Sequence, residues 1–454
     1  MKTDATKPTA QKGKTVAIIA MLFLFAMISF VTNLAAPIGT IWKNSYDWSG
    51  MLGNFMNFLA YAFMGVPAGL MLQKIGYKKT ALTAIIIGII GLGLQLMASY
   101  VGGSVGVFSV SGQVLTLNFI IYLLGAFICG FCVCILNVVV NPMLNLLGGG
   151  GNKGNQLVQV GGSANSLVGT LTPLCVGALV GQVTAGTSML DVVTLLYTGI
   201  GVFVLALVVI GCVAIPEPHR SGVSKKKDTH SPLSFRHTLL GVIGIFFYVG
   251  VEVGIPAVLI FYLSDSAASG ITENATATAT AVAAVYWLLM LVGRMVSSVI
   301  SGKVSSKAQL TVVSAIAIIL IITAILMPTD LRINVPAYSV ENGFTVADVP
   351  ANAFMLVLCG LCTSVMWGAI FNLAVEGLGK YTAKASGIFM AMVVGGGIMP
   401  FIQERVAGAC GYLNSYWLPV AMFAYLLFYA LVGSRNVNRD IPVDEDEAPD
   451  LRDL

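Results

Sequence analysis

Long apolar runs separated by short polar segments dominate the chain. Twelve of these runs approach or exceed the roughly 20 mostly apolar residues that an α-helix needs to cross a bilayer. They lie at 15–40, 50–72, 80–100, 115–146, 155–182, 191–215, 237–263, 275–302, 308–328, 351–376, 383–407 and 414–434. The pattern predicts an all-α membrane protein with twelve transmembrane helices.

One long polar connection interrupts this pattern near the middle of the chain. The segment 216–236, PEPHRSGVSKKKDTHSPLSFR, predicts a cytoplasmic linker between two six-helix bundles at 15–215 and 237–434. A basic tail precedes the bundles at 1–14, and an acidic tail that we expect to be disordered follows at 435–454. The first apolar run continues far past the length of a signal-peptide core, so we interpret it as a retained first helix.

The few charged residues orient the chain in a membrane. Only 10% of the residues are charged, against about 25% in soluble domains. The net charge of +4 is spread over the loops and forms no patch for a nucleic acid. With both termini inside, all but four of the 24 Lys and Arg residues fall in cytoplasmic segments; the exceptions are Lys43, Arg332, Arg294 and Arg405. This asymmetry follows the positive-inside rule and supports an even number of helices.

The two halves of the chain resemble each other. ICGFCVCILNVVVNPMLNLLG at 128–148 aligns with LCGLCTSVMWGAIFNLAVEGLG at 358–379, about half the chain later. Each segment leads through a short Lys-bearing loop to a Gly-rich helix that ends near a proline. Both contain Cys-x-x-Cys, but within apolar helices we expect these thiols to be small packing residues rather than metal ligands. Two parallel six-helix repeats are typical of major facilitator superfamily transporters.

Several segments make the likeness more specific. They are GVPAGLMLQKIGYKKT (65–80), NPMLNLLG (141–148), FFYVGVEVG (246–254), VEGLGKYTAKASG (375–387) and VGGGIMPFIQ (394–403). Over nearly its whole length the chain resembles the fucose/hexose symporter branch of that superfamily, which includes L-fucose permease and bacterial glucose/galactose transporters. The resemblance implies a multi-pass protein of a bacterial inner membrane that imports a monosaccharide by alternating access.

Two positions depart from the pattern of that branch. Relatives carry an acidic residue in the first helix and a Glu in the fourth, where this chain has Ala36 and Asn137. The resemblance implies that Asn137 lies where the family handles substrate and proton. An amide can hydrogen-bond to a sugar but cannot carry a proton, so a coupled symporter and a uniporter both stay open.

Polar side chains within the spans are the candidates for sugar binding. A sugar needs amide, hydroxyl or carboxylate partners for its hydroxyl groups and an aromatic ring for its apolar face, and polar residues are rare enough in membrane helices to be informative. The predicted binding residues are Asn33, Asn54, Asn57, Asn137, Asn141, Gln159, Asn165, Glu252, Trp367, Asn372 and Gln403. For each amide, interhelical hydrogen bonding is the structural alternative, and for Asn141, beside Pro142, it is favoured.

Glu252 is the sharpest of these candidates. An unpaired carboxylate near the centre of a membrane helix costs several kcal/mol, so a water-filled cavity, protonation or a nearby cation must offset the cost. We predict that Glu252 binds substrate or the coupling ion, Na⁺ or H⁺; pairing with Arg294 is the structural alternative. Arg294, Glu376 and Lys380 are predicted to have gating or structural roles. Trp367 aligns with Asn137 in the repeat, so both should face the central cavity.

Other function classes fit less well. The histidines His219, His230 and His237 lie in or beside the linker, and no buried pair suits catalysis, so we expect no enzyme, no cofactor and no metal site. A sugar sensor is a minor alternative, because the linker and tail leave no room for a signalling domain. We expect a monomer in the bilayer that binds a neutral hexose, with an amino sugar or a sialic acid as the second choice, and no nucleic acid.

Overall fold

The computed structural model describes residues 7–46, 49, 52–110, 112–180, 188–217, 230–272, 275–339, 343–438 and 440–443. Some of these residues are described by their backbone alone, including 7–13, 34–37 and 173–180. The middle of the linker, most of the acidic tail and the side chain of Ala36 therefore lie outside the described residues, and what the sequence predicts for them stays a prediction.

The N-terminal half contains five long helices and a hairpin. These elements are α1 (Lys7–Ser45), α2 (Leu52–Tyr100), β1 (Gly106–Val110), β2 (Gln113–Thr116), α3 (Leu117–Leu147), α4 (Gly151–Val180) and α5 (Val193–Cys212). α2 holds two of the predicted spans, since its backbone leaves the helical conformation at Gly76 (φ 82°, ψ 175°). A positive φ of this kind favours glycine. Beyond the break, the Glu217 carboxylate accepts hydrogen bonds from the backbone N–H groups of Tyr77 and Lys78. Glu217 follows α5 in the chain and caps the second helix of α2.

The C-terminal half repeats this plan with more interruptions. Its elements are η1 (Pro232–Ser234), α6 (Arg236–Ser264), α7 (Ser266–Ser269), α8 (Ala275–Ile300), α9 (Ser306–Leu326), β3 (Arg332–Ser339), β4 (Gly343–Pro350), α10 (Ala351–Val375), η2 (Gly379–Tyr381), α11 (Thr382–Ala391), η3 (Met392–Val394), α12 (Gly395–Cys410), α13 (Tyr412–Ser415), α14 (Trp417–Phe428) and η4 (Tyr429–Gly433). α11, η3 and α12 together form one span, and α13, α14 and η4 form the last. The twelve predicted helices are thus confirmed, and their bounds agree with the sequence pattern to within a few residues in most cases.

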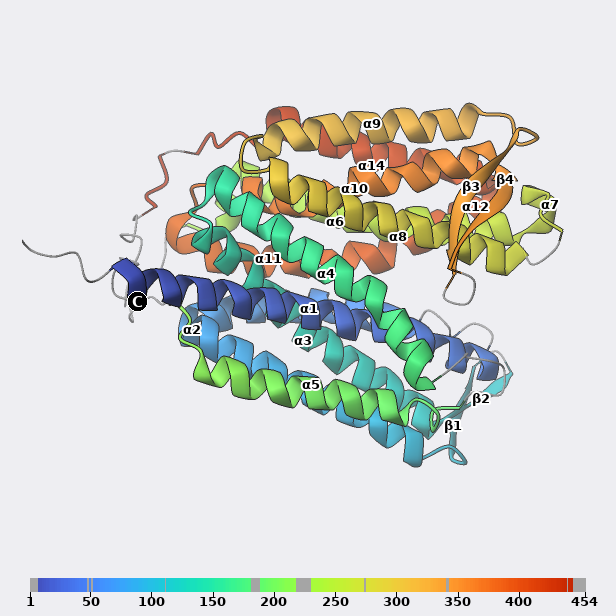
Figure 1. Ribbon diagram of the computed structural model, residues 1–454, viewed down its shortest axis with the longest axis horizontal. Coiled ribbons are helices and arrows are strands. Elements are labelled where there is room, and N and C mark those ends of the chain that lie inside the picture. The colour runs from blue at the N-terminus through green and yellow to red at the C-terminus, as the bar shows by residue number, and fades with distance from the viewer. Residues whose placement is uncertain are drawn as a thin grey trace, which may run out of the picture.

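The helices form two bundles that lie side by side (Figure 1). α1, α2, α3 and α5 lie in the lower bundle of that view and α6, α9, α10 and α14 in the upper one, while α4 runs along the boundary, where it contacts α8. Both hairpins lie at one end of the molecule, which we call the hairpin end. α1 begins at the opposite end, where the described chain also finishes, and we call this the termini end.

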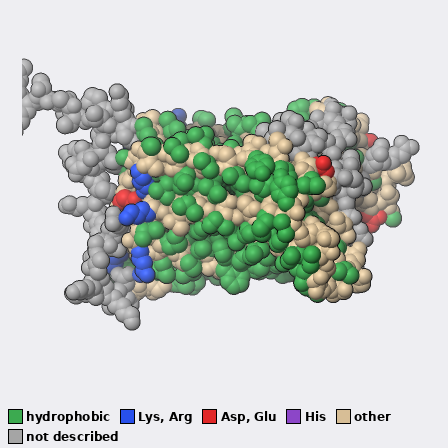
Figure 2. Space-filling model, turned by 90° about the horizontal axis from the view of Figure 1, so that it is seen from below, with side chains coloured by type: hydrophobic (Ala, Val, Ile, Leu, Met, Phe, Trp, Pro, Cys, Tyr) green, Lys and Arg blue, Asp and Glu red, His purple; other side chains and the backbone are tan. Residues whose placement is uncertain are grey.

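The surface matches the predicted membrane setting. On the face drawn in Figure 2, a broad apolar belt covers the helices, and Lys and Arg side chains gather at the termini end. Large apolar side chains such as Phe63, Val299 and Leu326 are more than half exposed on these helices, as expected where lipid replaces water. Ten helical runs among the described residues are long and apolar enough to cross a membrane.

The two hairpins were not predicted. β1 pairs with β2 between the third and fourth spans, and β3 pairs with β4 between the ninth and tenth, both antiparallel. The longer hairpin β3–β4 places Tyr338 opposite Phe344, and Gly343 follows its turn with a φ of 64°. An Asn-Gly pair, such as 342–343, between two runs of residues that favour β-strands is the strongest short sequence signal for a hairpin.

Candidate functional site

A large cavity lies between the two bundles. Its volume is about 1640 Å³, and residues of α1, α2, α3 and α4 line it from one bundle and residues of α6, α8 and α10 from the other. It continues to the hairpin end, where Tyr338 of β3 and Phe344 of β4 also line it. Polar and aromatic groups occur along its whole length, so the cavity offers hydrogen bonds and ring faces together.

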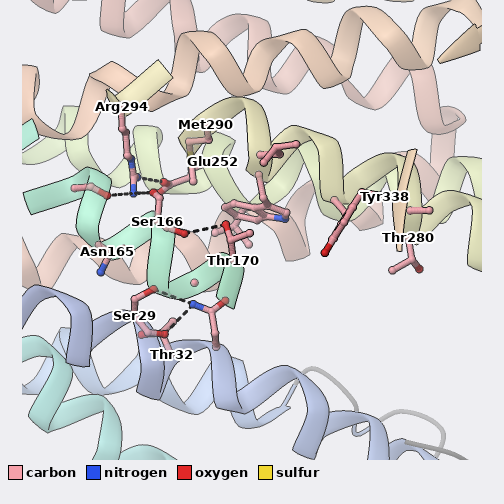
Figure 3. A pocket seen from close by; sticks show the side chains of 18 of the residues that line it. Ser29, Thr32, Asn165, Ser166, Thr170, Glu252, Thr280, Met290, Arg294 and Tyr338 are labelled. Carbon is pink, nitrogen blue, oxygen red and sulfur yellow. Dashed lines mark hydrogen bonds and ion pairs between the residues drawn. The ribbon is translucent and has the colours of Figure 1, made fainter. Parts of the chain in front are cut away.

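A charged pair forms one wall of the cavity (Figure 3). The Arg294 Nη2 of α8 lies 2.9 Å from the Glu252 Oε1 of α6, and the Tyr248 hydroxyl donates to the same carboxylate oxygen over 2.9 Å. Arg294 also donates from Nη1 to the Ser166 hydroxyl (2.7 Å) and to the Gly162 carbonyl (3.4 Å), both on α4. The side chains of Glu252 and Arg294 are only 13% and 10% exposed. The guanidinium therefore neutralises a buried acid within one bundle and binds the other bundle through two further hydrogen bonds.

Amides form the floor of the cavity. Asn137 of α3 donates to the Tyr61 hydroxyl (2.9 Å), and Asn141 donates to the side-chain oxygen of Asn137 (3.2 Å) and to its backbone carbonyl (2.9 Å). The Trp367 indole of α10 donates in turn to the Asn141 side chain over 2.9 Å. This chain of hydrogen bonds joins the two bundles directly beneath the cavity. It explains why an apolar helix contains two asparagines beside Pro142: one faces the cavity, and the other connects the bundles.

The wall opposite the charged pair comes from α1 and α4. Asn33 donates to both the carbonyl (2.8 Å) and the hydroxyl (3.2 Å) of Ser29, and Asn165 donates to the Phe25 carbonyl over 3.0 Å. Figure 3 shows Ser29, Thr32 and Asn165 grouped on this side. These hydrogen bonds fix the side-chain nitrogens of Asn33 and Asn165. Because each amide group is rigid and planar, they also fix the direction of its oxygen.

Beyond the floor, toward the termini end, the bundles close on each other through neutral groups. Asn145 of α3 donates to the Asn372 oxygen of α10 (2.7 Å), and Asn372 donates to the Ser306 hydroxyl (2.9 Å). Gln159 of α4 donates to the Val365 carbonyl over 2.8 Å. α2 and α11 also approach closely, because a Cβ on Gly387 would lie 2.6 Å from the backbone oxygen of Gly65.

The structure brings together about half of the predicted binding residues. Those that line the cavity are Asn33, Asn137, Gln159, Asn165, Glu252 and Trp367, together with Arg294. Trp367 and Asn137, matched in the internal repeat, both reach it. The others, Asn54, Asn57, Asn141, Asn372 and Gln403, are not among the described residues that line the cavity, and neither are Glu376 and Lys380.

The predicted residues outside the cavity have other surroundings. Asn57 faces a small void within the N-terminal bundle beside Gln95 and Tyr122, and Asn372 belongs to the closed end. Gln403 is fully buried against the backbone of Gly254, where a Cβ would meet its amide oxygen at 2.7 Å. At the termini end, the Glu376 carbonyl is 3.0 Å from a ring nitrogen of His237, and Lys380 lies over the Tyr381 ring.

Several residues in or beside the cavity were not predicted from the sequence. Tyr248 and Ser166 complete the environment of the charged pair, and Tyr61 holds Asn137. Tyr248 lies one turn before Glu252, a spacing that puts both on one helix face, so it could have been found. Tyr338 and Phe344 were missed because no strand was predicted there.

Residues 17–402 match the profile of the Major Facilitator Superfamily. The chain belongs to that superfamily. A glucose/galactose transporter of Brucella abortus is 29% identical over 441 residues, which cover 95% of this chain and 97% of the relative. A putative glucose/galactose transporter of Helicobacter pylori is also 29% identical, over 93% and 97%.

Solved structures of this superfamily share the fold. The transporter FucP in its outward conformation superposes with a TM-score of 0.74 at 18% sequence identity, over 92% of this chain and 98% of that one. A variant of the Escherichia coli fucose:proton symporter FucP gives 0.73 at 19%. At such identities the likeness establishes the two-bundle fold of the superfamily. These relatives are transporters, and none is an enzyme.

Proposed function

We propose that this protein imports a neutral monosaccharide, with a hexose as the first choice. The observation that carries the proposal is the cavity between the bundles, which is lined by amides, hydroxyls and the Trp367 indole. Its charged pair, Glu252 and Arg294, has no net charge. Sugars are recognised by this mixture of hydrogen-bonding groups and aromatic faces. The Brucella abortus and Helicobacter pylori relatives, named for glucose and galactose, support the same substrate class.

The charges favour a neutral sugar over a sialic acid. Among the described residues that line the cavity, the charged side chains are Glu252, Arg294 and Asp348. Arg294 already pairs with Glu252, and Asp348 lies 2.7 Å from the Arg332 Nε. An acidic sugar would need an uncompensated cation, and Arg405, the other arginine in a span, stacks instead on the Phe401 ring. An amino sugar is the second candidate.

The transport step we propose is alternating access at this cavity. The cavity reaches the hairpin end, while the Asn145–Asn372 and Gln159–Val365 contacts join the bundles toward the termini end. Breaking these contacts while the hairpin end closes would pass the sugar across the membrane. We place the termini end in the cytoplasm of a bacterial cell, with the protein as a monomer in the inner membrane, because basic side chains gather there (Figure 2).

Glu252 is the proposed site of ion coupling, and Na⁺ and H⁺ are both candidates. It is the acidic residue at the centre of the cavity, and Arg294 and Tyr248 would have to release it for it to take up a proton or a sodium ion. The same pairing supports the alternative, a uniporter. If the pair never opens, Glu252 stays ionised throughout the cycle, and Asn137 cannot replace it as a proton carrier.

Uptake into proteoliposomes tests the proposal. Radiolabelled glucose, galactose, fucose, an amino sugar and a sialic acid are each offered with a proton gradient, a Na⁺ gradient or neither. Accumulation of a neutral sugar driven by one gradient supports the symporter, and equilibration that ignores both gradients supports the uniporter. Saturable binding without any uptake would instead identify a sugar sensor, and uptake of only the sialic acid would overturn the neutral-substrate assignment.

A further inference from the structure

The cavity is longer than one monosaccharide needs. Pockets for small ligands usually measure about 300–1,000 Å³, and this one reaches about 1640 Å³. Both Thr280 and Arg294 of α8 line it, and their separation of 14 positions corresponds to about 21 Å of helix at 1.5 Å per residue. A single pyranose ring is much shorter than that distance, so a sugar bound beside Arg294 leaves the outer part of the cavity unoccupied.

The outer part has its own chemistry. Tyr338 and Phe344 lie opposite each other on β3–β4 with ring centroids 5.1 Å apart, and both line the cavity. Phe344 is 68% exposed, although its neighbours on the buried side of the hairpin, Val335 and Ala337, are almost fully covered. Figure 3 shows Tyr338 projecting into the cavity, with Thr280 of α8 at the same end. Aromatic rings beside hydroxyl groups suit the apolar face and the polar rim of a sugar.

The hairpin holds these rings in place. Arg332 donates to the Asp348 carboxylate (2.7 Å), to the Asp348 carbonyl (2.8 Å) and to the Ser269 carbonyl beyond α6 (3.1 Å). β3 also packs against α8. Because the charge of Asp348 is met by Arg332, the outer part of the cavity favours a neutral ligand, as the central part does. A preorganised ring pair costs little conformational entropy on binding.

We infer that Tyr338 and Phe344 form a second, outer binding subsite for the sugar, which a monosaccharide occupies on its way to the central site. This inference rests on the proposed function. Ring stacking supplies the contact, and Thr278 and Thr280 line the same cavity from α8. The outer site has fewer polar partners than the centre, so it binds the same sugar more weakly.

Equilibrium binding of the transported sugar to the full chain in lipid nanodiscs tests the subsite. The wild type should titrate in two phases, and the double variant Tyr338→Ala/Phe344→Ala should lose the weaker phase and keep the stronger one. In proteoliposomes the same variant should raise the KM for uptake about two- to tenfold with little change in kcat, the range expected for one aromatic contact. Tyr338→Phe keeps the ring, so this variant should keep the weaker binding phase and a KM close to that of the wild type.

Asn334→Ala is the matched control, since Asn334 lies exposed on β3 and is not among the described lining residues. This variant should leave both binding phases and the KM unchanged. That result would show that a substitution in the hairpin is not enough to change binding and that the aromatic rings are required. A single binding phase in the wild type, or a double variant with unaltered binding but slower transport, would overturn the subsite and make the hairpin a mechanical element. If the wild type binds no sugar at all, the proposed function itself fails.

Discussion

At the scale of single residues, the pair of Glu252 and Arg294 is the most consequential feature. Breaking a buried ion pair by removing one partner costs about 3–5 kcal/mol, because the other charge stays buried without compensation. Arg294→Gln should therefore destabilise the protein strongly, and Glu252→Gln should do so as well. The double variant should be more stable than Arg294→Gln, since it leaves no lone charge. Thermal unfolding of the four proteins, followed by tryptophan fluorescence in detergent, measures the coupling. Additive losses would mean that the two charges do not depend on each other.

The same carboxylate allows a second prediction, which concerns coupling rather than stability. Glu252→Gln should abolish accumulation of sugar against a gradient, because an amide cannot take up a proton or attract Na⁺ as a carboxylate does. Exchange of sugar across the membrane should continue, since the Asn137 and Asn33 walls of the cavity are unchanged. Counterflow and gradient-driven uptake in the same vesicles separate the two. Full accumulation by this variant would remove Glu252 from the coupling step.

Whether the position of a site residue could be predicted depends on whether its chemistry fixes the direction that its side chain faces. A buried acid such as Glu252 must find a cation or water, so both its position and its pairing with Arg294 were foreseeable. An amide has no such demand. Asn57 and Gln403 sit in apolar spans like Asn137, yet they face the interior of their bundles. The rotation of a helix that is apolar on all sides cannot be derived from its own sequence.

At the scale of elements, the approach of α2 to α11 holds the termini end closed. A Cβ on Gly387 would lie 2.6 Å from the Gly65 oxygen and 2.8 Å from the Gly69 Cα. Gly387→Leu should therefore oppose this closed arrangement. Overpacking costs about 1–3 kcal/mol, which corresponds to a shift of about 5- to 150-fold in the equilibrium.

Maleimide labelling of Asn145→Cys from the termini side would report that opening, and sugar uptake should fall in parallel. Gly201→Leu is the matched control, because a Cβ there meets nothing within 4 Å. Unchanged labelling in Gly387→Leu would show that α2 and α11 can separate locally without opening the bundles.

Helices and hairpins differ in how well the hydrophobic pattern predicts them. The helices were predicted because a membrane span must satisfy its own backbone and so needs a long apolar run. The hairpins β1–β2 and β3–β4 lie at the hairpin end, outside that constraint. β3–β4 alternates between buried Val335 and Ala337 and exposed residues, and the sequence has an Asn-Gly pair at 342–343, next to the start of β4. These signals are short, and a search for spans of about 20 residues passes over them.

At the scale of the whole molecule, the contacts between the bundles among the described residues include hydrogen bonds between neutral groups and those of Arg294. Asn145–Asn372 and Asn141–Trp367 connect amide and indole groups, and Arg294 reaches Ser166. A neutral hydrogen bond contributes only about 0.5–1.5 kcal/mol net. Such contacts can close one end of a transporter without making that end hard to reopen. The internal repeat predicted the two bundles but not which of their residues meet.

The Asn145–Asn372 contact allows a direct test of rocking between the bundles. In a background lacking Cys175, Cys212 and Cys410, the variant Asn145→Cys/Asn372→Cys should react with a short, reducible bifunctional thiosulfonate, because the two side chains lie 2.7 Å apart in this arrangement. The bridge should stop uptake and exchange almost completely, and a reductant should restore both. Sugar binding from the hairpin side should persist, since the cavity stays open to that end. Each single-cysteine variant, treated in the same way, should keep its transport. Continued transport by the bridged protein would mean that the sugar crosses without separation of the bundles at this point, and alternating access about the central cavity would have to be abandoned.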